Sequence, residues 1–409
     1  MRITWSVPVP GEPLCGSRGD VVRARHLIEA LRAEGHELCV VERAAAPATA
    51  ATVATYRRVV RGLVPRGPAL VLRDAGRWAE AWVHGRRVAA AALAQGADLI
   101  VETQVHFAGS GALAARTTGL PLLLDDCSPS SEERALGAGL PGLARRVFRT
   151  QVRAARHVVV SSRALRRCLT REGVPAEKLH VVPNGVDLTA YLRADRDAAR
   201  RRLGLEAACV IGFAGSFQPW HRVDLLVEAL ALLGDEPAVH VLLLGDGPER
   251  PRALAAARSF GLDRRVIAPG AVPPEELPEW IAACDIGALP GSNDYGQPMK
   301  LMDYAAAGLP AVAPDLAPVR EVVEDGVTGL LFAPGHGPAL SRALARLIRD
   351  AALRRAMGAR ARRVAEGGSW RARAQQLVAL VTQPRPSHGG TARGVTWIGA
   401  GLQNSGLQN

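Results

Sequence analysis

Short apolar runs alternate with amphipathic segments along most of the chain. Each run is roughly four to eight residues long and rich in Val, Leu, Ile and Ala, which is typical of buried parallel strands. In the first half the runs lie at 3–8, 38–41, 97–102, 121–125, 157–161 and 179–182. In the second half they lie at 209–214, 239–244, 266–269, 286–289, 310–313 and 329–332. We expect each half to form a parallel sheet.

The segments between these runs carry apolar residues at helical spacing. In segment 20–34, for example, Val22, Leu27 and Leu31 fall on one face of a helix. Residues 45–95 are rich in Ala and Arg and are expected to be largely helical. Further helices are predicted at 143–156, 223–233, 249–261, 274–283, 299–307, 337–350, 351–367 and 370–382. Strands that alternate with helices, twice over, predict an α/β fold of two doubly wound domains.

A polar stretch marks the predicted boundary between the two halves. Residues 193–202 are expected to form a linker with a short helix, between a domain at 1–187 and a second at 201–367. Residues 368–382 form the last predicted helix. Residues 383–409 contain PRPSHGGTARG and a repeated GLQN, a composition that predicts a disordered tail.

The net charge of +12 changes this picture by pointing to anionic partners. Nucleotide phosphates, nucleic acid and an acidic membrane face are the candidate classes. Aromatic residues make up only 4% of the chain, few of them lie in basic stretches, and no nucleic-acid-recognition motif is present. These features disfavour a nucleic-acid-binding protein.

The cysteines and the apolar runs bear on the cellular compartment. The six cysteines are scattered singly, which favours free thiols in a reducing compartment over disulfides or zinc. The N-terminus lacks the longer apolar core of a signal peptide, and no apolar run approaches the roughly 18 residues that span a bilayer. We therefore expect a cytoplasmic protein, monomeric or homodimeric.

The stretch 289–334 holds the strongest candidate chemistry. A loop with Gly291, Gly296 and Pro298 follows a predicted strand and leads into a helix that begins near Met299. The unpaired N–H groups of a helix N-terminus favour a phosphate or diphosphate, and Lys300 in the first turn suits the same anion. Asp303, one turn further on, is placed to reach a hydroxyl beside that anion. The alternative is an ordinary crossover with Lys300 and Asp303 in solvent.

A basic helix is predicted between two strands of the first half. Its arginines fall mostly on one face; they are Arg145, Arg146, Arg149, Arg153 and Arg156. A solvated helix face is one interpretation, and peripheral contact with a membrane surface is the other.

Several separated motifs together resemble the retaining nucleotide-sugar glycosyltransferases of family 4. The motifs are VVPNGVD (181–187), FAGSFQPWHRVDLLVEAL (213–230), LLLGDGPER (242–250), VPPEELPEWIAACDIGALP (272–290), PMKLMDYAAAGLPAVA (298–313) and EVVEDGVTGLLFAP (321–334). The similarity is strongest from about residue 155 to 382. It implies the GT-B fold, in which two Rossmann-like domains face each other across a cleft and the last helix packs back towards the N-terminal domain.

The resemblance also implies roles for residues on the donor side. Asp303 matches the glutamate that binds the donor ribose, and Tyr295 stands where the family has a first glutamate near the sugar. Ser216 and His221 stand where the family usually has a cationic pair for the diphosphate, so that Lys300 takes over this charge. The remaining donor-binding residues that the resemblance implies are Gly16, Val272, Gly296, Met299 and Leu301. Lys300, His221 and Asp126 are the expected catalytic residues.

The acceptor side is implied less sharply. Residues after two strands of the first half are expected to line the cleft; they are His106, Asp125, Asp126 and Ser128. Either aspartate could help deprotonate an acceptor, or instead cap the helix that follows. Natural-product cores, cyclitols, lipid-linked glycans and thiols all stay open as acceptors.

The implied reaction moves a sugar from a UDP- or GDP-linked donor, which is a substrate and not a cofactor, with no metal ion required. The Ala/Arg bias of a GC-rich genome suggests a role in bacterial natural-product (antibiotic) biosynthesis. A sugar epimerase or phosphorylase with the same fold is the alternative, because fold alone does not fix the reaction.

Overall fold

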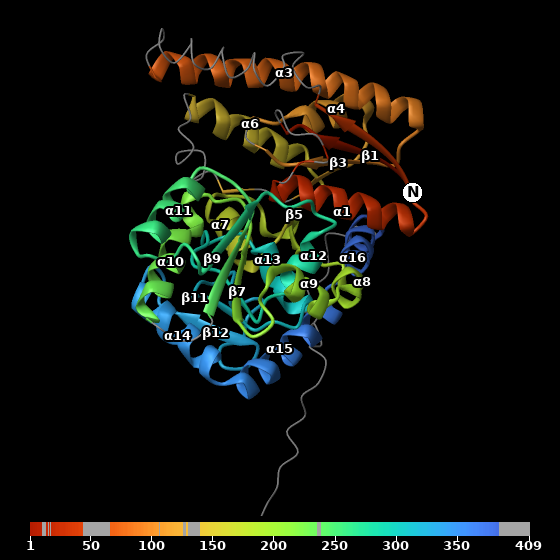
Figure 1. Ribbon diagram of the computed structural model, residues 1–409. Coiled ribbons are helices and arrows are strands. Elements are labelled where there is room, and N and C mark those ends of the chain that lie inside the picture. The colour runs from red at the N-terminus through yellow and green to blue at the C-terminus, as the bar shows by residue number, and fades with distance from the viewer. Residues whose placement is uncertain are drawn as a thin grey trace, which may run out of the picture.

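The structure is a computed structural model, shown in Figure 1. It describes residues 1–9, 14, 16, 18–43, 66–105, 107–125, 128–129, 140–234 and 239–383. Two parallel six-stranded sheets lie one above the other in the view of Figure 1, each between layers of helices. The predicted class, α/β with two doubly wound domains, is confirmed.

The first sheet has the strand order β2-β1-β3-β4-β5-β6. Its strands are β1 (Arg2–Val7), β2 (Glu37–Glu42), β3 (Leu99–Thr103), β4 (Leu122–Asp125), β5 (His157–Val160) and β6 (Leu179–Val181). Its helices are α1 (Gly19–Ala33), α3 (Arg66–Gln95), α4 (Ser110–Thr118), α6 (Pro141–Ala154) and α7 (Arg163–Arg171). Apolar residues of α3, α4 and α6 pack on one face of this sheet, and those of α1 pack on the other.

The second sheet has the order β12-β11-β10-β7-β8-β9. Its strands are β7 (Cys209–Ala214), β8 (Val239–Leu244), β9 (Val266–Gly270), β10 (Ile286–Ala288), β11 (Ala311–Pro314) and β12 (Gly329–Phe332). Its helices are α10 (Val223–Leu232), α11 (Arg250–Ser259), α12 (Leu277–Ala282), α13 (Met299–Ala306), α14 (Gly337–Arg349) and α15 (Ala351–Glu366). The chain builds one side of the sheet from β7 outward and then crosses to β10, so the strand order reverses between β7 and β10.

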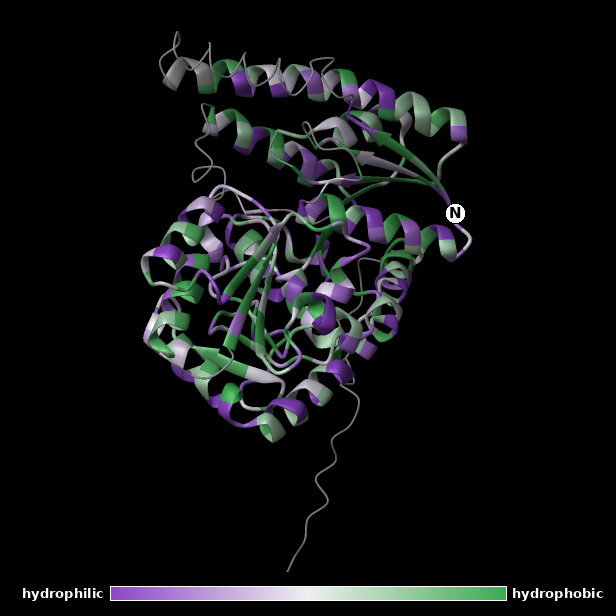
Figure 2. Cartoon of the chain, in the orientation of Figure 1, coloured by the Kyte–Doolittle hydropathy of each residue, from purple (hydrophilic) through white to green (hydrophobic). Residues whose placement is uncertain are grey.

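The hydropathy pattern explains this layering. Figure 2 shows apolar residues concentrated along the strands, while the helices carry apolar and polar residues on different sides. Trp5, Ile100 and Leu123 in the first sheet and Ile211 and Val312 in the second are at most 1% exposed. Burial of these side chains supplies the main driving force for both domains.

The predicted linker is more ordered than the sequence suggested. Residues 188–203 form two helices, α8 (Leu188–Arg193) and α9 (Arg196–Leu203). Arg200 of α9 is buried and donates to Asp285 and to the carbonyl of Ala283 at 3.0 Å each. The charges in this polar stretch therefore dock α9 on the second domain.

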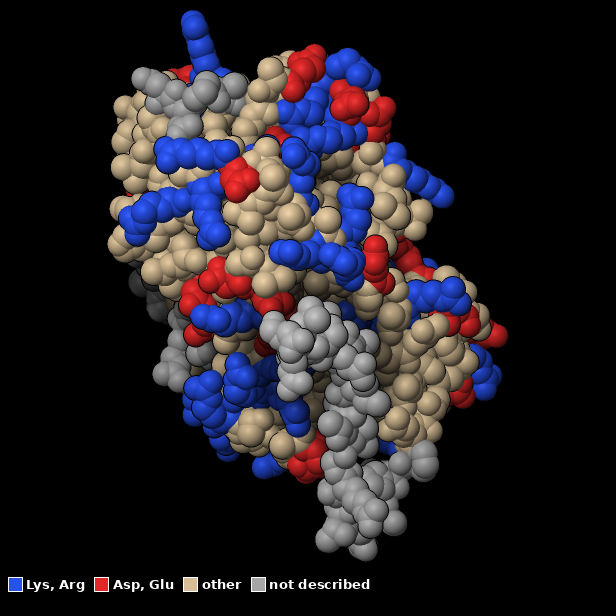
Figure 3. Space-filling model, turned by 90° about the horizontal axis from the view of Figure 1, so that it is seen from below, with Lys and Arg blue, Asp and Glu red and all other residues tan. Residues whose placement is uncertain are grey.

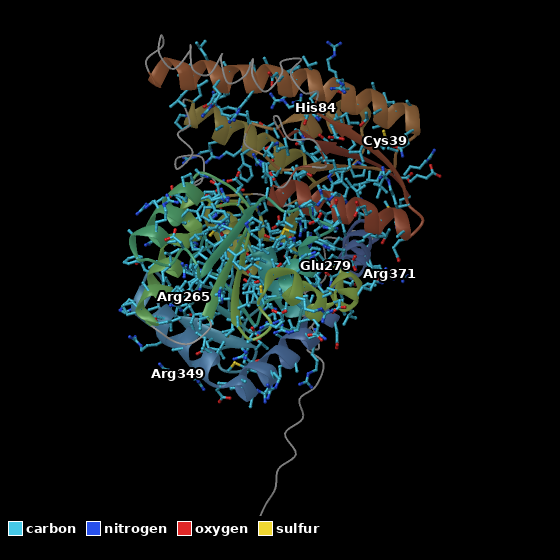
Figure 4. The ribbon with its side chains drawn as sticks, viewed as in Figure 1. Cys39, His84, Arg265, Glu279, Arg349 and Arg371 are labelled. Atoms are coloured by element: carbon cyan, nitrogen blue, oxygen red, sulfur yellow. The ribbon has the colours of Figure 1, made fainter. Side chains whose placement is uncertain are left out.

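The chain returns to the first domain at its last described helix. Helix α16 (Trp370–Thr382) lies beside α1, and its residues Trp370, Ala374 and Leu377 join the core beneath the first sheet. Arg371 pairs with Glu34 at the end of α1 (Figure 4). Residues 384–409, the predicted disordered tail, lie outside the described residues.

Charge is distributed in mixed fashion over the face seen in Figure 3. Lys and Arg side chains are interspersed with Asp and Glu and form no continuous basic stripe on this face. Helix α6 buries Phe148 and Val152 and exposes Arg145, Arg146, Arg149 and Arg153, so the predicted arginine face does point outward. Its contact with a membrane stays a prediction. Within the described part of the chain, no helix combines the length and apolar character needed to cross a bilayer.

Candidate functional site

The candidate site lies where the strand order of the second sheet reverses. Doubly wound sheets bind ligands at such a switch point, outside the carboxyl ends of the strands. Here the loop after β7 (215–222) and the loop after β10 (289–298) diverge from neighbouring strands, and the second loop leads into α13. These two loops and α13 contain the donor residues that were predicted within 216–221 and 295–303.

Tyr304 fixes α13 against this edge of the sheet. Its buried hydroxyl accepts from the amide of Ala214 at 3.1 Å and donates to the carbonyl of Ala288 at 3.2 Å, so it bridges β7 and β10 where they separate. Gly287 makes room for the ring, because a Cβ there would lie 2.3 Å from Tyr304. Tyr304 therefore anchors the middle of α13 to the ends of β7 and β10.

Lys300 reaches from the first turn of α13 back over the end of β7. Its Nζ lies 3.2 Å from Nε2 of His221 and 5.2 Å from the centre of the Phe213 ring. A Cβ on Gly215 would lie 3.0 Å from the same ammonium, so glycine at this position keeps space free beside it. Burial lowers the pKa of Lys300 to about 8, against the opposing influence of the Asp303 carboxylate.

His221 acts as a neutral acceptor for this lysine. Its Nδ1 lies within hydrogen-bonding distance of the carbonyl oxygen of Ser216, which only accepts, so Nδ1 must carry the proton. Nε2 is then the bare nitrogen that faces the Lys300 ammonium. Burial and the charge of Lys300 lower the pKa of His221 to about 3, so the ring carries no charge at neutral pH. His221 therefore orients the Lys300 ammonium without adding a second charge beside it.

Asp303 lies one helical turn beyond Lys300. Its carboxylate accepts a hydrogen bond from the hydroxyl of Tyr191 on α8, which is itself buried. Burial raises the pKa of Asp303 to about 6, although the Tyr191 bond and the Lys300 charge act in the opposite direction. A carboxylate has about four lone-pair directions, so the Tyr191 bond leaves acceptor capacity for ligand hydroxyls.

The loop before α13 lies against the first domain. The Asn293 side chain accepts from the amide of Gly296 at 2.8 Å and shapes the turn, and the side chains of Tyr295 and Met299 pack on apolar clusters of the first domain. The carbonyl of Tyr295 accepts from Ser162 of that domain. Leu301 is buried in the second domain. The N-terminus of α13 thus lies at the interface of the two domains.

Glycines of the loop after β8 support the loop after β7. Gly245 has a φ of +122°, and a Cβ there would lie 2.1 Å from the carbonyl oxygen of Gly215. The amide of Phe217 donates to the carbonyl of Asp246 at 3.0 Å. The GDGP motif therefore serves loop packing. Val272 follows β9 on the same side of the sheet and packs partly on the core.

Arg222 adopts a backbone conformation that usually favours glycine. Its φ of +48° lies in the left-handed region, which costs a side chain about 1–2 kcal/mol. The conformation ends the loop and begins α10.

The predicted acceptor-side residues are less well assembled. Asp125 is fully buried at the end of β4, where the Arg23 guanidinium binds it at 2.9 Å. Ser128 is exposed. Gly16, which was predicted on the donor side, has a carbonyl that accepts from Arg25 at 3.4 Å. His106 and Asp126 lie outside the described residues. Among the described residues, no group of three His, Cys, Asp or Glu side chains is arranged to hold a metal ion.

Sequence reasoning missed the residues that support the site from a distance. Tyr191, the partner of Asp303, and Tyr304 were assigned no role. Tyr304 is adjacent to Asp303 in sequence. The one signal that could have indicated its role is Gly287, a glycine within a strand, which can mark the place where a ring from a neighbouring helix packs closely.

Comparisons with known proteins identify the family of the chain. The chain matches the family described as "Glycosyltransferase Family 4" over residues 18–190 and "Glycosyl transferases group 1" over residues 208–350. The D-inositol 3-phosphate glycosyltransferase of Nocardia farcinica is 36% identical over 234 residues, which cover 54% of this chain and 51% of that protein. The chain thus spans about half the length of this relative.

Longer matches cover nearly the whole chain. The D-inositol 3-phosphate glycosyltransferase of Xylanimonas cellulosilytica is 31% identical over 401 residues, 92% of this chain and 95% of that protein. The crystal structure of Anabaena Alr3699/HepE in complex with UDP and glucose has a TM-score of 0.73 at 22% identity and covers 93% of this chain and 99% of that one. By its sequence and its fold, the chain belongs to glycosyltransferase family 4 and has the GT-B architecture.

Proposed function

We propose that this protein transfers a sugar from a UDP-linked donor to a hydroxyl of a small, polyhydroxylated acceptor, with retention of configuration. The observation that carries the proposal is Lys300, whose ammonium is held by His221 over Gly215 beside the N-terminus of α13. This arrangement offers a fixed cation and the N-terminal end of α13 to a diphosphate.

The donor is oriented by residues on both sides of this cation. Asp303 accepts hydrogen bonds from the ribose hydroxyls, which places the base toward Val272 and the diphosphate at Lys300. Charge grows on the diphosphate as the bond to the sugar breaks, so a preorganised cation and helix amides stabilise the transition state more than the ground state.

The reaction proceeds on one face of the sugar. Double displacement would need a carboxylate nucleophile about 5 Å from a second carboxyl group. The loop 289–298 contains a single carboxylate, Asp294, which is exposed, and Tyr295 stands where the family usually has glutamate. The acceptor hydroxyl therefore attacks the anomeric carbon from the side of the departing diphosphate. That diphosphate takes the hydroxyl proton, which gives a retained glycoside and UDP.

The choice of UDP and of a cyclitol-like acceptor is supported by the relatives. HepE was solved with UDP and glucose, and the named relatives act on D-inositol 3-phosphate. A natural-product cyclitol is an acceptor of the same chemistry. It also agrees with the Ala/Arg-rich composition of the chain, which is typical of a GC-rich genome.

The test begins with thermal shifts against UDP, GDP, dTDP and ADP, since a ligand that binds the folded state raises its apparent stability. We expect UDP to give the largest shift. Incubation of UDP-glucose with myo-inositol or D-inositol 3-phosphate should then give a product whose anomeric proton shows retention by NMR, with activity preserved in EDTA. An inverted linkage, a free epimerised sugar, or activity that EDTA abolishes and magnesium restores would contradict the proposal.

A further inference from the structure

Asn184 connects the two domains through hydrogen bonds that the reaction described above does not use. It lies in the PNG turn after β6 and is 4% exposed. Its side-chain oxygen accepts from Arg23 at 2.9 Å, its backbone amide donates to Oε1 of Gln297 at 2.6 Å, and its Nδ2 donates to the Gln297 carbonyl at 3.0 Å. One side chain thus touches α1 of the first domain and the loop before α13 of the second.

The end of this connection in the first domain is rigid. The guanidinium of Arg23 is fully buried and binds Asp125 through Nε at 3.1 Å and Nη2 at 2.9 Å. It also donates to the carbonyl of Val182 at 3.0 Å. A planar guanidinium with this many partners has one orientation, so it fixes the Asn184 side chain in turn.

The other end lies next to the candidate site. Gln297 precedes Pro298, the residue before the first turn of α13, and α13 has no side-chain cap of its own. The direction of the first turn, which carries Lys300, therefore depends on contacts made by the preceding loop. Both hydrogen bonds from Asn184 fall on Gln297 itself.

We infer that the residues Asp125, Arg23, Asn184 and Gln297, here called the buried strut, set the position of the α13 N-terminus relative to the first domain. Asn184 and Gln297 are positioning residues for the diphosphate, and this role rests on the proposed function of Lys300. The strut also gives Asp125 a role other than that of an acceptor base.

The sharpest variant is Asn184→Asp. It keeps the oxygen that Arg23 binds and the backbone amide, and it replaces the donor Nδ2 with an oxygen that repels the Gln297 carbonyl. Calorimetry should compare UDP with UMP, because their affinity ratio reports the contacts of the second phosphate. We expect Asn184→Asp to lower this ratio about tenfold, the effect of losing one charge-assisted bond, with little change for UMP.

Two further variants separate positioning from simple stability. Gln297→Ala removes the Oε1 acceptor and should reproduce the effect, whereas Gln297→Glu keeps an acceptor there and should stay near the wild-type ratio. The matched control is Glu321→Ala. Glu321 accepts from the amides of Arg163 and Ala164 at 2.9 and 3.0 Å across the same interface, at the start of α7 and not at Gln297. It should lower the melting temperature and leave the ratio unchanged.

Lys300→Ala serves as the reference in the same assay. A ratio unchanged by Lys300→Ala would refute the proposed diphosphate site itself. A ratio lowered by Lys300→Ala but unchanged in both Asn184→Asp and Gln297→Ala would overturn the strut alone. Equal losses in Asn184→Asp and Glu321→Ala would also overturn it, because they would show that any loosening of the interface has this effect.

Discussion

Lys300 combines a half-buried ammonium with a neutral partner, and this combination makes it responsive to an anion. His221 accepts one hydrogen bond from the ammonium but supplies no negative charge, and Phe213 covers another side. Asp303 is the nearby carboxylate that acts on its pKa. The negative charge of a bound diphosphate would therefore compensate the positive charge of Lys300 more fully than its present neighbours do.

The pKa of Lys300, about 8, predicts how the affinity for UDP depends on pH. A bound diphosphate favours the ammonium, so binding above pH 8 requires the uptake of a proton. Affinity for UDP should be flat from pH 7 to 8 and should fall by up to tenfold per pH unit above 8. Calorimetry from pH 7 to 9.5 measures this.

The matched control for this prediction is Lys300→Arg. Arginine keeps its charge throughout this range, so its affinity profile should be flat. A wild-type profile that is also flat to pH 9.5 would exclude Lys300 as the titrating contact.

Asp303 should discriminate between ribose and deoxyribose. We expect Asp303→Ala to weaken UDP binding about 10- to 100-fold, the loss of about 1.5–3 kcal/mol for a hydrogen bond to a charged group. Wild-type protein should prefer UDP to 2′-deoxy-UDP, and Asp303→Ala should bind the two nearly equally. A variant that retains the full preference would assign the ribose to another residue.

At this scale, sequence reasoning selected the residues of the candidate site more readily than the residues that support them. Lys300, His221 and Asp303 were selected, and the structure brings them together from the loop after β7 and from α13. Tyr191, which binds Asp303, and Asn184, which holds Gln297, depend on contacts between segments far apart in the chain. The PNG sequence at 183–185 is typical of a turn, and no local pattern indicates what the Asn184 side chain touches.

The loops at the switch point depend on glycine for their close approach. A Cβ added at Gly212 in β7 would lie 2.5 Å from the sulfur of Cys284. A Cβ added at Gly245 would lie 2.1 Å from the carbonyl oxygen of Gly215 in the loop after β7. These glycines allow β7, β10 and the two loops to pack without side chains between them. The elements therefore fix the site through backbone contacts.

Gly245→Ala tests this packing. Its φ of +122° and the 2.1 Å approach both oppose a side chain, so the loop at 215–217 must move. We expect a loss of stability of about 2–4 kcal/mol in urea unfolding and a clear loss of UDP affinity.

The control variant is Gly261→Ala, whose φ is +68° but whose added Cβ would meet nothing within 4 Å. It should cost about 1–2 kcal/mol for its backbone conformation and leave UDP binding intact. Equal effects of the two variants on binding would show that the contact between the loops does not matter.

Element boundaries were predictable wherever a short apolar run was bounded by turn residues. The strands at 209–214, 239–244 and 329–332 and the helix at 370–382 match the predicted ranges. The stretch at 188–203 did not read as two docked helices, because the residues of α9 are mainly polar. Its packing depends on ion pairs to Asp285, which lies far away in sequence.

At the scale of the whole molecule, the last described helix belongs to the first domain's core although it follows the second domain. Leu377 of α16 is fully buried between α1 and the first sheet. The domains are therefore joined at two places, by α8 and α9 and by α16, in addition to the contacts of the buried strut.

Leu377→Ala should destabilise the protein by about 2–5 kcal/mol, the cost of a cavity in a packed core. The control is Leu192→Ala, since Leu192 is 58% exposed and should give less than about 0.5 kcal/mol. Denaturant unfolding followed by tryptophan fluorescence measures both, because Trp5 and Trp370 lie in the affected core. Similar values for the two variants would show that α16 does not contribute to that core.

The most direct test of the diphosphate site compares the affinities of UDP and UDP-glucose for the wild-type protein and for Lys300→Ala. UDP carries the extra negative charge that develops as the sugar departs, whereas UDP-glucose does not. If Lys300 stabilises that developing charge, Lys300→Ala should weaken UDP binding about tenfold more than UDP-glucose binding. Equal weakening of both ligands, or no weakening of either, would contradict the assignment of Lys300 to the leaving diphosphate.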